Sequence, residues 1–529
     1  MATVTVPRGE LEVVQDVASN PDSGTSSEPS VSFTSLRFSS GKIFYTWNET
    51  STYSPPRLLK LAAQSLLRNE VLRGSDLEDL PAGLFPLLFM EAVATKDQES
   101  LIKAMVQAWP FTHLPLGNLM PIPNEKILKA TLDGLDMLLF QKVHPRRWKM
   151  EVLDLRQNAK QDFCSLVWSG ARDACSAKVT RQTMEGSPNM GKKQPLKVFA
   201  DLCLAEQGLS KFLSCLFGWA EQRKGLVHVH CTMLQILTTP IHLVREILQM
   251  VGLDFFEEVD VCWEFGLTIL AEFAPYLSQM SNLRKLHLGN IGVIHFTNYT
   301  SPERKEELAV QFISQFQNLN LQKLHLCTLS FLKGRLDQCL RCLKTPLQTL
   351  KLESCFLTDS DMISLSQCLC TSQLKRLDLS GTYLANLNLE PFQHLLERVA
   401  KTLTFLILIK CGITDTQLSA FLPALSRCVR LEYLELYGNP ISEAAQERLR
   451  HHTAKLSRLR FETYPLPMMG HYKKGARRTR FVQIESKLSG TPGDLGQSKM
   501  VTYYTYPCYE CGTWQFYHPQ YPFCKCMFD

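Results

Sequence analysis

The sequence lacks the features of a membrane or secreted protein. It contains no run of 18 consecutive apolar residues, and no basic segment followed by an apolar one stands at its N-terminus. We therefore expect no membrane contact and no secretory route. Net charge is also small, since 57 basic and 51 acidic residues leave +6 over 529 residues. An excess of this size does not indicate direct binding to nucleic acid.

Catalytic signatures are missing as well. The sequence has no glycine-rich phosphate loop, no His-Glu-x-x-His motif and no Gly-x-Ser-x-Gly elbow. These motifs carry phosphate binding, zinc hydrolysis and serine nucleophiles respectively. The histidines are scattered along the chain rather than paired with a candidate nucleophile. We therefore expect a binding protein and not an enzyme.

Cysteine, in contrast, is plentiful, with 18 residues, many of them inside apolar strand-like segments. Without a secretion signal these residues indicate buried free thiols in a reducing compartment. We expect the cytoplasm, with the nucleus open as a second location. Four cysteines at the end of the chain form a separate pattern: Cys508, Cys511, Cys524 and Cys526. Paired cysteines at such spacings favour one structural zinc ion over free thiols or a disulfide.

The dominant feature is a repeat, Leu-x-x-Leu-x-Leu, which occurs six times. The copies start at Leu283, Leu321, Leu347, Leu374, Leu403 and Leu431. Successive starts among the last five lie 26 to 29 residues apart, the period of a leucine-rich repeat made of one strand and one return helix. The sequence predicts an α/β leucine-rich repeat solenoid, whose stacked units share one core.

Around this array the chain divides into five parts. Residues 1–53 are rich in Ser, Thr and Pro and predict a disordered extension. Residues 54–145 form a helical region, which begins after two prolines. Residues 146–282 contain degenerate repeats, at WKMEVLDLRQN, GLVHVHCTML and EEVDVCWEFGL, with a flexible insert at 176–196. Regular repeats follow at 283–460, and a Cys-rich C-terminal cap at 461–529.

The first predicted helix carries two apolar stripes. One consists of Leu58, Ala62 and Leu66, and the other, about 100° around the helix, of Leu59, Ala63 and Leu67. Two interpretations remain open. Either both stripes are buried within the protein, or one packs inward and the other receives a partner.

The first stripe resembles the elongin-binding box of ubiquitin-ligase substrate receptors, in which a leucine fills a pocket on elongin C and a small residue permits close approach. Here Ala62 stands where many boxes have cysteine, and Arg57 precedes the leucine. The short segment with Leu80, Pro81 and Leu84 resembles the cullin box that pairs with the cullin-two scaffold. The order and spacing of the two motifs match those of such receptors.

Longer strings resemble the PRAME family over residue 54 to the C-terminus, among them PPRLLKLAAQSLLRNE, LPAGLFPLLFMEA, KAMVQAWPFTHLPLGNLM and CGITDTQL. The resemblance implies a ribonuclease-inhibitor-like horseshoe. It implies a substrate-recognition adaptor of a cullin-RING ubiquitin ligase, with elongin B/C, a cullin-RING scaffold and a protein substrate as partners. It also implies an alternative: a transcriptional corepressor or scaffold, acting with nuclear receptors of the retinoic acid type or chromatin factors. Germline expression and effects on proliferation, differentiation and apoptosis belong to the same resemblance.

The outward positions of the repeat strands predict the substrate surface. Side chains alternate along a strand, so the third, fifth and seventh repeat positions face the concave side. The early repeats offer a basic strip there, and the late repeats an apolar and aromatic patch. The candidate residues are Lys285, His287, Lys323, His325, Phe405, Ile407, Tyr433 and Tyr437. A substrate bound here would direct acidic groups to the lysines and apolar groups to the rings, unless the chain's own tail covers the patch.

Overall fold

The computed structural model describes residues 37–39, 42–44, 58–68, 76–95, 98–140, 148–157, 162–167, 195–262, 267–289, 301–465, 500–504, 516–518 and 521–522. The chain separates into two compact units, Met1–Leu61 and Ala62–Asp529. The described part of the first unit holds a short antiparallel pair, β1 (Arg37–Ser39) and β2 (Lys42–Phe44), and the start of helix α1 (Leu58–Arg68).

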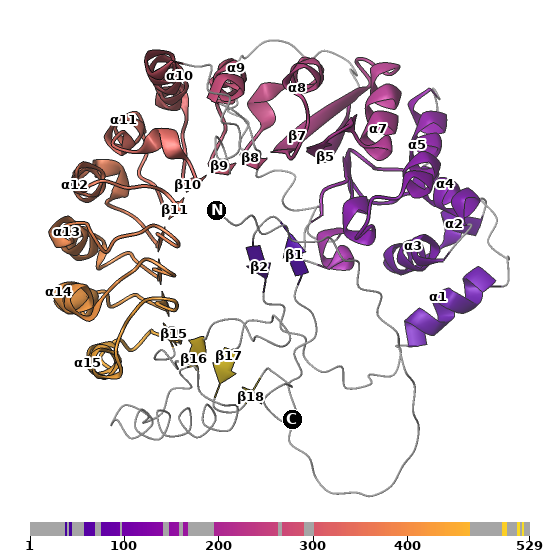
Figure 1. Ribbon diagram of the computed structural model, residues 1–529. Helices are drawn as coiled ribbons and strands as arrows, with labels where there is room; N and C mark the ends of the chain where they lie inside the picture. The colour runs from indigo at the N-terminus through magenta and orange to yellow at the C-terminus, as the bar shows by residue number, and fades with distance from the viewer. Residues whose placement is uncertain are drawn as a thin grey trace, which may run out of the picture. The chain divides into compact units, whose positions relative to one another are not determined.

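The second unit is built on one large sheet, in which each strand pairs with the next along the array (Figure 1). Its strands are β3 (His113–Leu114), β4 (Val152–Asp154), β5 (Leu196–Ala205), β6 (Gly208–Leu209), β7 (Val227–Ile236), β8 (Glu258–Cys262), β9 (Lys285–Gly289), β10 (Lys323–Cys327), β11 (Thr349–Glu353), β12 (Arg376–Asp378), β13 (Phe405–Ile407), β14 (Tyr433–Glu435), β15 (Phe461–Pro465), β16 (Met500–Tyr504), β17 (Phe516–His518) and β18 (Tyr521–Pro522). Pairing is parallel from β3 to β16 and antiparallel for β6, β17 and β18.

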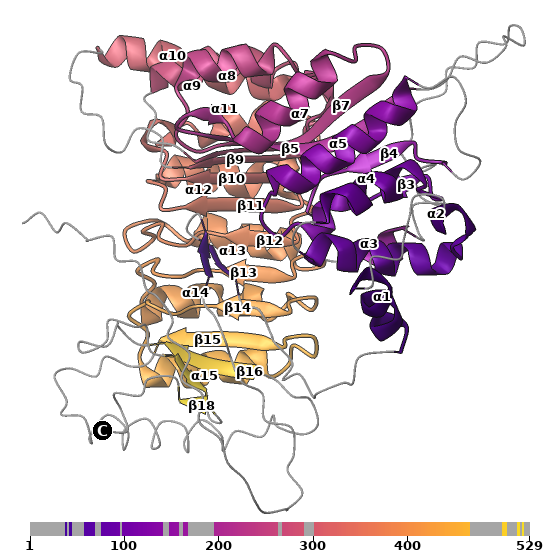
Figure 2. The ribbon, with the colours of Figure 1, turned by 90° about the vertical axis from the view of Figure 1, so that its right-hand side faces the viewer.

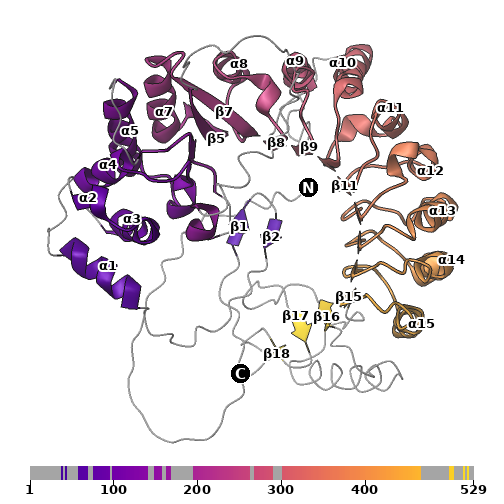
Figure 3. The ribbon, with the colours of Figure 1, turned by 180° about the vertical axis from the view of Figure 1, so that it is seen from behind.

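Helices return the chain between the strands and lie along one side of the sheet, as Figure 2 shows from the side and Figure 3 from behind. In the repeat array they are α7 (Lys211–Glu221), α8 (Ile241–Leu248), α9 (Leu267–Leu277), α10 (Pro302–Ser314), α11 (Leu336–Arg341), α12 (Asp359–Gln367), α13 (Glu390–Val399), α14 (Asp415–Leu425) and α15 (Glu443–Thr453). Single 3₁₀ turns stand at η3 (Leu253–Phe255), η4 (Gln315–Asn318), η5 (Ser330–Leu332) and η6 (Leu369–Thr371). One strand and one helix per unit is the organisation that the leucine spacing predicted.

The repeat leucines explain why these segments form strands in this register. The two inward leucines of β10 align with those of β9 and β11, and all of them are fully buried. Removing each such side chain from water is worth about 2 kcal/mol, and a shift of one residue would turn the whole set outward. The leucine ladder therefore fixes which side chains remain on the outer face of the sheet.

Loop side chains satisfy the backbone at the ends of the strands. Thr382 Oγ1 accepts from the Cys355 amide at 3.2 Å and donates to the Leu352 carbonyl at 2.7 Å. Two repeats later, the Asn439 carboxamide accepts a hydrogen bond from the Cys411 amide at 2.9 Å and donates one to the Leu408 carbonyl at 2.7 Å. A buried backbone group without a partner is costly, so these contacts hold consecutive units in register.

The helical region before the array contains α2 (Asp76–Asp79), η1 (Ala82–Leu84), α3 (Phe85–Ala94), α4 (Glu99–Gln107), η2 (Leu116–Leu119) and α5 (Glu125–Leu139). Its core is aromatic: Phe85, Phe89 and Phe163 surround Trp109, at ring-centroid distances of 5.9, 5.1 and 6.4 Å. This cluster belongs to the same continuous core as the repeat leucines. No helix in the described ranges is long and apolar enough to cross a membrane.

The sheet differs from the sequence prediction at the end of the predicted insert and at the end of the regular repeats. Strand β5 begins at Leu196, the last residue of the predicted insert, and carries a ten-residue alternating pattern. At the other end, β15 pairs in parallel with β14 beyond the predicted boundary at residue 460. Glu462 and Tyr464 occupy the inward positions there, and the Tyr464 hydroxyl donates to the Glu462 carboxylate at 2.8 Å. A hydrogen-bonded pair replaces two leucines, which hides the unit from a leucine pattern.

Candidate functional site

The outward side chains of the sheet form rows, because parallel strands in register place equivalent repeat positions side by side. We call this surface the strand face. Its first row runs through Glu258, Lys285, Lys323, Thr349, Arg376, Phe405, Tyr433 and Phe461. Its second row runs through Asp260, His287, His325, Lys351, Asp378, Ile407 and Glu435. Every predicted substrate-face residue except Tyr437 lies in one of these rows.

In the early half, carboxylates on β8 compensate the predicted basic residues of β9. Lys285 forms an ion pair with Glu258. His287 Nδ1 lies 2.6 Å from Asp260 Oδ1, and both side chains are buried. The leucine motif does not indicate these two acids, because β8 lacks it. They are found only from the register of β8 and β9 in the structure, which sets Glu258 beside Lys285 and Asp260 beside His287.

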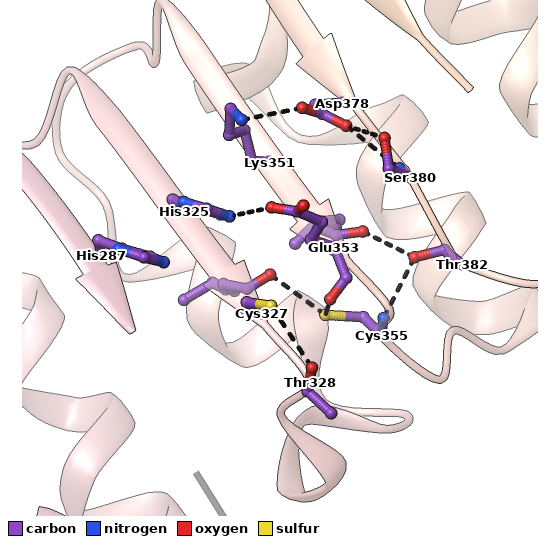
Figure 4. Close-up of polar contacts among 12 residues, drawn as sticks. His287, His325, Cys327, Thr328, Lys351, Glu353, Cys355, Asp378, Ser380 and Thr382 are labelled. Carbon is purple, nitrogen blue, oxygen red and sulfur yellow. Dashed lines mark hydrogen bonds and ion pairs between the residues drawn. The ribbon is translucent and has the colours of Figure 1, made fainter. Parts of the chain in front are cut away.

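The two predicted histidines meet at the centre of the early half. Their rings are parallel within 4°, with centroids 3.9 Å apart. His325 Nε2 lies 2.6 Å from a Glu353 oxygen (Figure 4). Burial lowers the pKa of His325, although the contact with Glu353 opposes this shift. Burial alone would raise the pKa of Glu353, but the hydrogen bond and charge of His325, together with the nearby Lys351 charge, hold that pKa below the usual range.

Two lysines of this half differ in how freely they present charge. Lys351 Nζ lies 3.0 Å from Asp378, which also accepts a 2.6 Å hydrogen bond from the Ser380 hydroxyl (Figure 4). Lys323 is exposed and has no ion pair within the part of the chain that the structure describes. The early half therefore carries less uncompensated positive charge than its sequence suggests, and Lys323 supplies most of it.

The late half of the first row is a stack of rings. The Arg376 guanidinium lies 4.9 Å from the centre of the Phe405 ring. Phe405 stacks on Tyr433 at 4.5 Å and 17°, and Tyr433 contacts Phe461 at 5.4 Å. All four side chains are half-buried, as is Tyr437. The late half of the first row therefore consists of partly exposed aromatic rings beside one cation.

The second row of the late half is more deeply buried. Ile407, predicted as exposed apolar surface, is only 4% exposed. Glu435 lies beside it in register. Burial, helped by the nearby Asp378 charge, raises the pKa of Glu435 to about 7. This carboxyl therefore changes charge near neutral pH.

Helix α1 presents its two apolar stripes differently. Ala63 and Leu67, at 4% and 8% exposure, belong to the core. Ala62 is exposed, and Leu66 is half-buried against the core. Leu61, which widens the first stripe, is 46% exposed. The side chain of Leu58 lies outside the described residues.

The cullin-box-like segment lies where the chain enters α3. Pro81 is exposed and precedes η1. Leu80 and Leu84 are half-buried and pack against the core. This arrangement leaves one edge of each leucine at the surface.

The predicted zinc ligands Cys508, Cys511, Cys524 and Cys526 all lie outside the described residues. Among the residues that are described, no group of three or more His, Cys, Asp or Glu side chains is arranged to hold a metal ion. Zinc at the C-terminal cysteines therefore stays a prediction.

Comparison with known proteins identifies the family. Residues 55–164 match the PRAME N-terminal domain, and residues 196–526 match the PRAME C-terminal domain. The chain is 47% identical to human PRAME family member 20 over 481 residues, which cover 90% of this chain and all of that protein. It is 48% identical to human PRAME family member 12 over 465 residues, 87% of this chain and 95% of the relative. The helical region and the repeat array together therefore mark this chain as a member of the PRAME family.

Proposed function

We propose that this chain is a non-catalytic substrate-recognition adaptor of an elongin–cullin two type ubiquitin ligase. Elongin C would contact the α1 stripe of Leu58, Ala62 and Leu66, and the cullin would contact Leu80, Pro81 and Leu84. The strand face would hold the protein to be ubiquitinated. The adaptor would act in the cytoplasm, and also in the nucleus.

The main support for this proposal is that one apolar face of α1 is buried in the protein and the adjacent apolar face is exposed. One stripe already packs into the core through Ala63 and Leu67. The adjacent surface keeps an exposed leucine and an exposed alanine, Leu61 and Ala62. A small residue in an exposed apolar stripe permits close approach of a second helix, which is the arrangement that an elongin-binding box requires.

Packing distances support a horseshoe of the ribonuclease-inhibitor type, with the strand face on its concave side. Neighbouring strands lie about 4.8 Å apart, whereas neighbouring helices need about 8–10 Å. Each unit of the array contributes one strand and one helix, so the helix side is longer than the strand side. Curvature toward the strands would expose their outward rows to one bound substrate.

The strand face favours a protein segment with an acidic group and an apolar group. Lys323 is the exposed cation of the early half, beside Lys285. The side chains of Phe405, Tyr433 and Tyr437 remain partly exposed in the late half. An extended substrate that crosses several strands would therefore place its acidic group near Lys323 and its apolar group near the rings. The same surface would serve a corepressor scaffold, so α1 decides between the two functions.

The test is direct binding of the purified full-length chain to the elongin B–C complex, measured by calorimetry. In the test variant, Ala62→Arg, a long side chain replaces an exposed methyl group, so the change blocks close approach without disturbing the core. We expect affinity to fall about 100-fold or more, equivalent to about 3 kcal/mol.

Lys323→Asp is the matched control, because it also alters an exposed residue but lies on the strand face. It should bind elongin B–C as well as the unmodified chain and lose substrate instead. If the unmodified chain fails to bind elongin B–C, or if both variants bind equally, the adaptor proposal is refuted. The solenoid is then better described as a corepressor or interaction scaffold outside the ligase.

A further inference from the structure

Two cysteines face each other at the end of α12. Cys368 closes that helix, and Cys370 lies in the following turn, η6. Their sulfur atoms are 3.2 Å apart in an S–H···S contact, in which either thiol can donate. Cys370 is buried, Cys368 is half-buried, and Leu369 between them is 82% exposed. The pair therefore lies near the protein surface, with Cys368 partly exposed and Cys370 buried.

The surrounding contacts hold this turn in place. Thr371 Oγ1 donates to the Cys368 carbonyl at 2.8 Å and to the Leu365 carbonyl at 2.9 Å. The Arg398 guanidinium donates to the Cys368 carbonyl at 2.8 Å and to the Ser366 carbonyl. These bonds leave the two thiols oriented toward each other. They also bring a positive charge to the pair, which favours a thiolate.

Other buried cysteines of the repeats are bonded differently. Cys355, Cys411 and Cys428 donate their thiols to backbone carbonyls, at 3.4, 3.1 and 3.8 Å. Burial raises the pKa of each to about 12, so they act as structural donors. In the facing pair, the hydrogen bond between the two thiols, with the nearby Arg398 charge, holds the pKa of Cys368 below its usual range, and the same bond raises that of Cys370. Cys368 therefore has the character of an attacking thiolate, and Cys370 that of a resolving thiol.

We propose that Cys368 and Cys370 form a dithiol site that a small-molecule disulfide of the glutathione type oxidises. The Cys368 thiolate attacks one sulfur of glutathione disulfide, which forms a mixed disulfide and releases one glutathione thiolate. Cys370 then loses its proton and attacks Cys368 Sγ. This step forms the Cys368–Cys370 disulfide and releases a second glutathione. The protein loses two electrons and two protons, and the oxidant becomes two molecules of glutathione. The site is independent of the adaptor function.

The test exposes the reduced full-length chain to glutathione buffers of increasing oxidised fraction, followed by alkylation, tryptic digestion and mass spectrometry. The peptide of residues 352–375 contains both cysteines and also Cys355, a buried internal reference. We expect this peptide to lose two hydrogen atoms, while Cys355 stays a thiol. Before oxidation, Cys368 should react with the alkylating reagent about tenfold faster than Cys342, which is also half-buried but has a pKa raised by burial.

Two variants separate the site from general thiol chemistry. Cys370→Ser should trap one glutathionyl group on Cys368, because the resolving thiol is gone, and Cys342→Ser should leave disulfide formation unchanged. Circular dichroism checks that each variant is folded. The proposal is overturned if Cys370→Ser gains no glutathionyl group. It is equally overturned if the disulfide that forms joins Cys368 to Cys342 or Cys339, or if both cysteines of the pair remain reduced in fully oxidised glutathione.

Discussion

The early and late halves of the strand face share one backbone plan but differ in their chemistry. Between β8 and β12, outward residues pair by charge, as in Lys285 with Glu258 and Lys351 with Asp378. Between β12 and β15, the first row instead stacks Arg376, Phe405, Tyr433 and Phe461. In both halves, buried leucines occupy the equivalent inward positions of the strands. The difference therefore arises from the outward positions alone.

The comparison shows that a residue's neighbours on this surface are its equivalents in adjacent repeats. Strands about 4.8 Å apart bring such residues into direct contact. A lysine that would be a free cation in an isolated unit becomes half of an ion pair, and an aromatic ring becomes one layer of a stack. The binding properties of the strand face are thus set by rows that cross many units.

The largest expected effect is a loss of stability that is similar in the two halves. Leu324 in β10 and Leu406 in β13 are both fully buried inward leucines. Leu324→Ala and Leu406→Ala should each lower the free energy of unfolding by about 3 kcal/mol, because each removes buried methyl groups and leaves a cavity. Urea denaturation of the full-length chain measures the change.

Lys323→Ala is the control for this pair, since it alters an exposed outward residue of the same strand as Leu324. Its effect should stay within about 0.5 kcal/mol. If one leucine variant is destabilised and the other is not, the halves do not share a common core. The early and late halves would then be two separately stabilised segments.

The leucine motif was sufficient to predict the fold of the array. Each of the six copies became a parallel strand, β9 to β14, and the leucines face inward because burial requires one register. The additional unit at β15 could not be found in this way. Its inward positions are Glu462 and Tyr464, whose side chains are hydrogen-bonded to each other, and a leucine pattern does not detect them.

The candidate surfaces were less predictable, because they depend on contacts between distant segments. The two stripes of α1 were visible in the sequence, but the choice of the buried one was not. It follows from packing against the helical region, where Gln64 donates to Glu91 on α3 at 3.0 Å. Similarly, nothing near Lys285 in the sequence indicates Glu258, which lies 27 residues earlier.

An intermediate effect should appear as a pH dependence confined to the late half. Burial and the nearby Asp378 charge raise the pKa of Glu435 from its ordinary value of 4.5 to about 7. Between these values the folded chain keeps a proton that the unfolded chain has lost, so stability falls as pH rises from about 4.5 to about 7. Glu435→Gln removes this loss. The variant should be more stable than the unmodified chain by about 2 kcal/mol at pH 8 and similar to it at pH 4.5.

Denaturation of both proteins across this pH range measures the difference. Glu432→Gln, in the same repeat, controls for the loss of a carboxylate. A pH-dependent gain of equal size in the control would show that the slope does not come from Glu435. If the difference in stability between Glu435→Gln and the unmodified chain does not change with pH, the carboxyl that causes the pH dependence is another residue of the row.

The smallest expected effect measures the stack itself. A double-mutant cycle with Phe405→Leu and Tyr433→Leu keeps apolar bulk at both positions and removes the facing rings, which lie 4.5 Å apart. We expect a coupling energy of about 1 kcal/mol, because stacked rings gain this much beyond their buried area. A parallel cycle between Phe405 and Lys323, which lie three strands apart in the first row, should give no coupling. If the two cycles agree, the rings are only apolar filling. If only the neighbouring pair couples, the late half is preorganised as a ring stack, and a bound substrate meets a rigid surface there rather than one that must be ordered first.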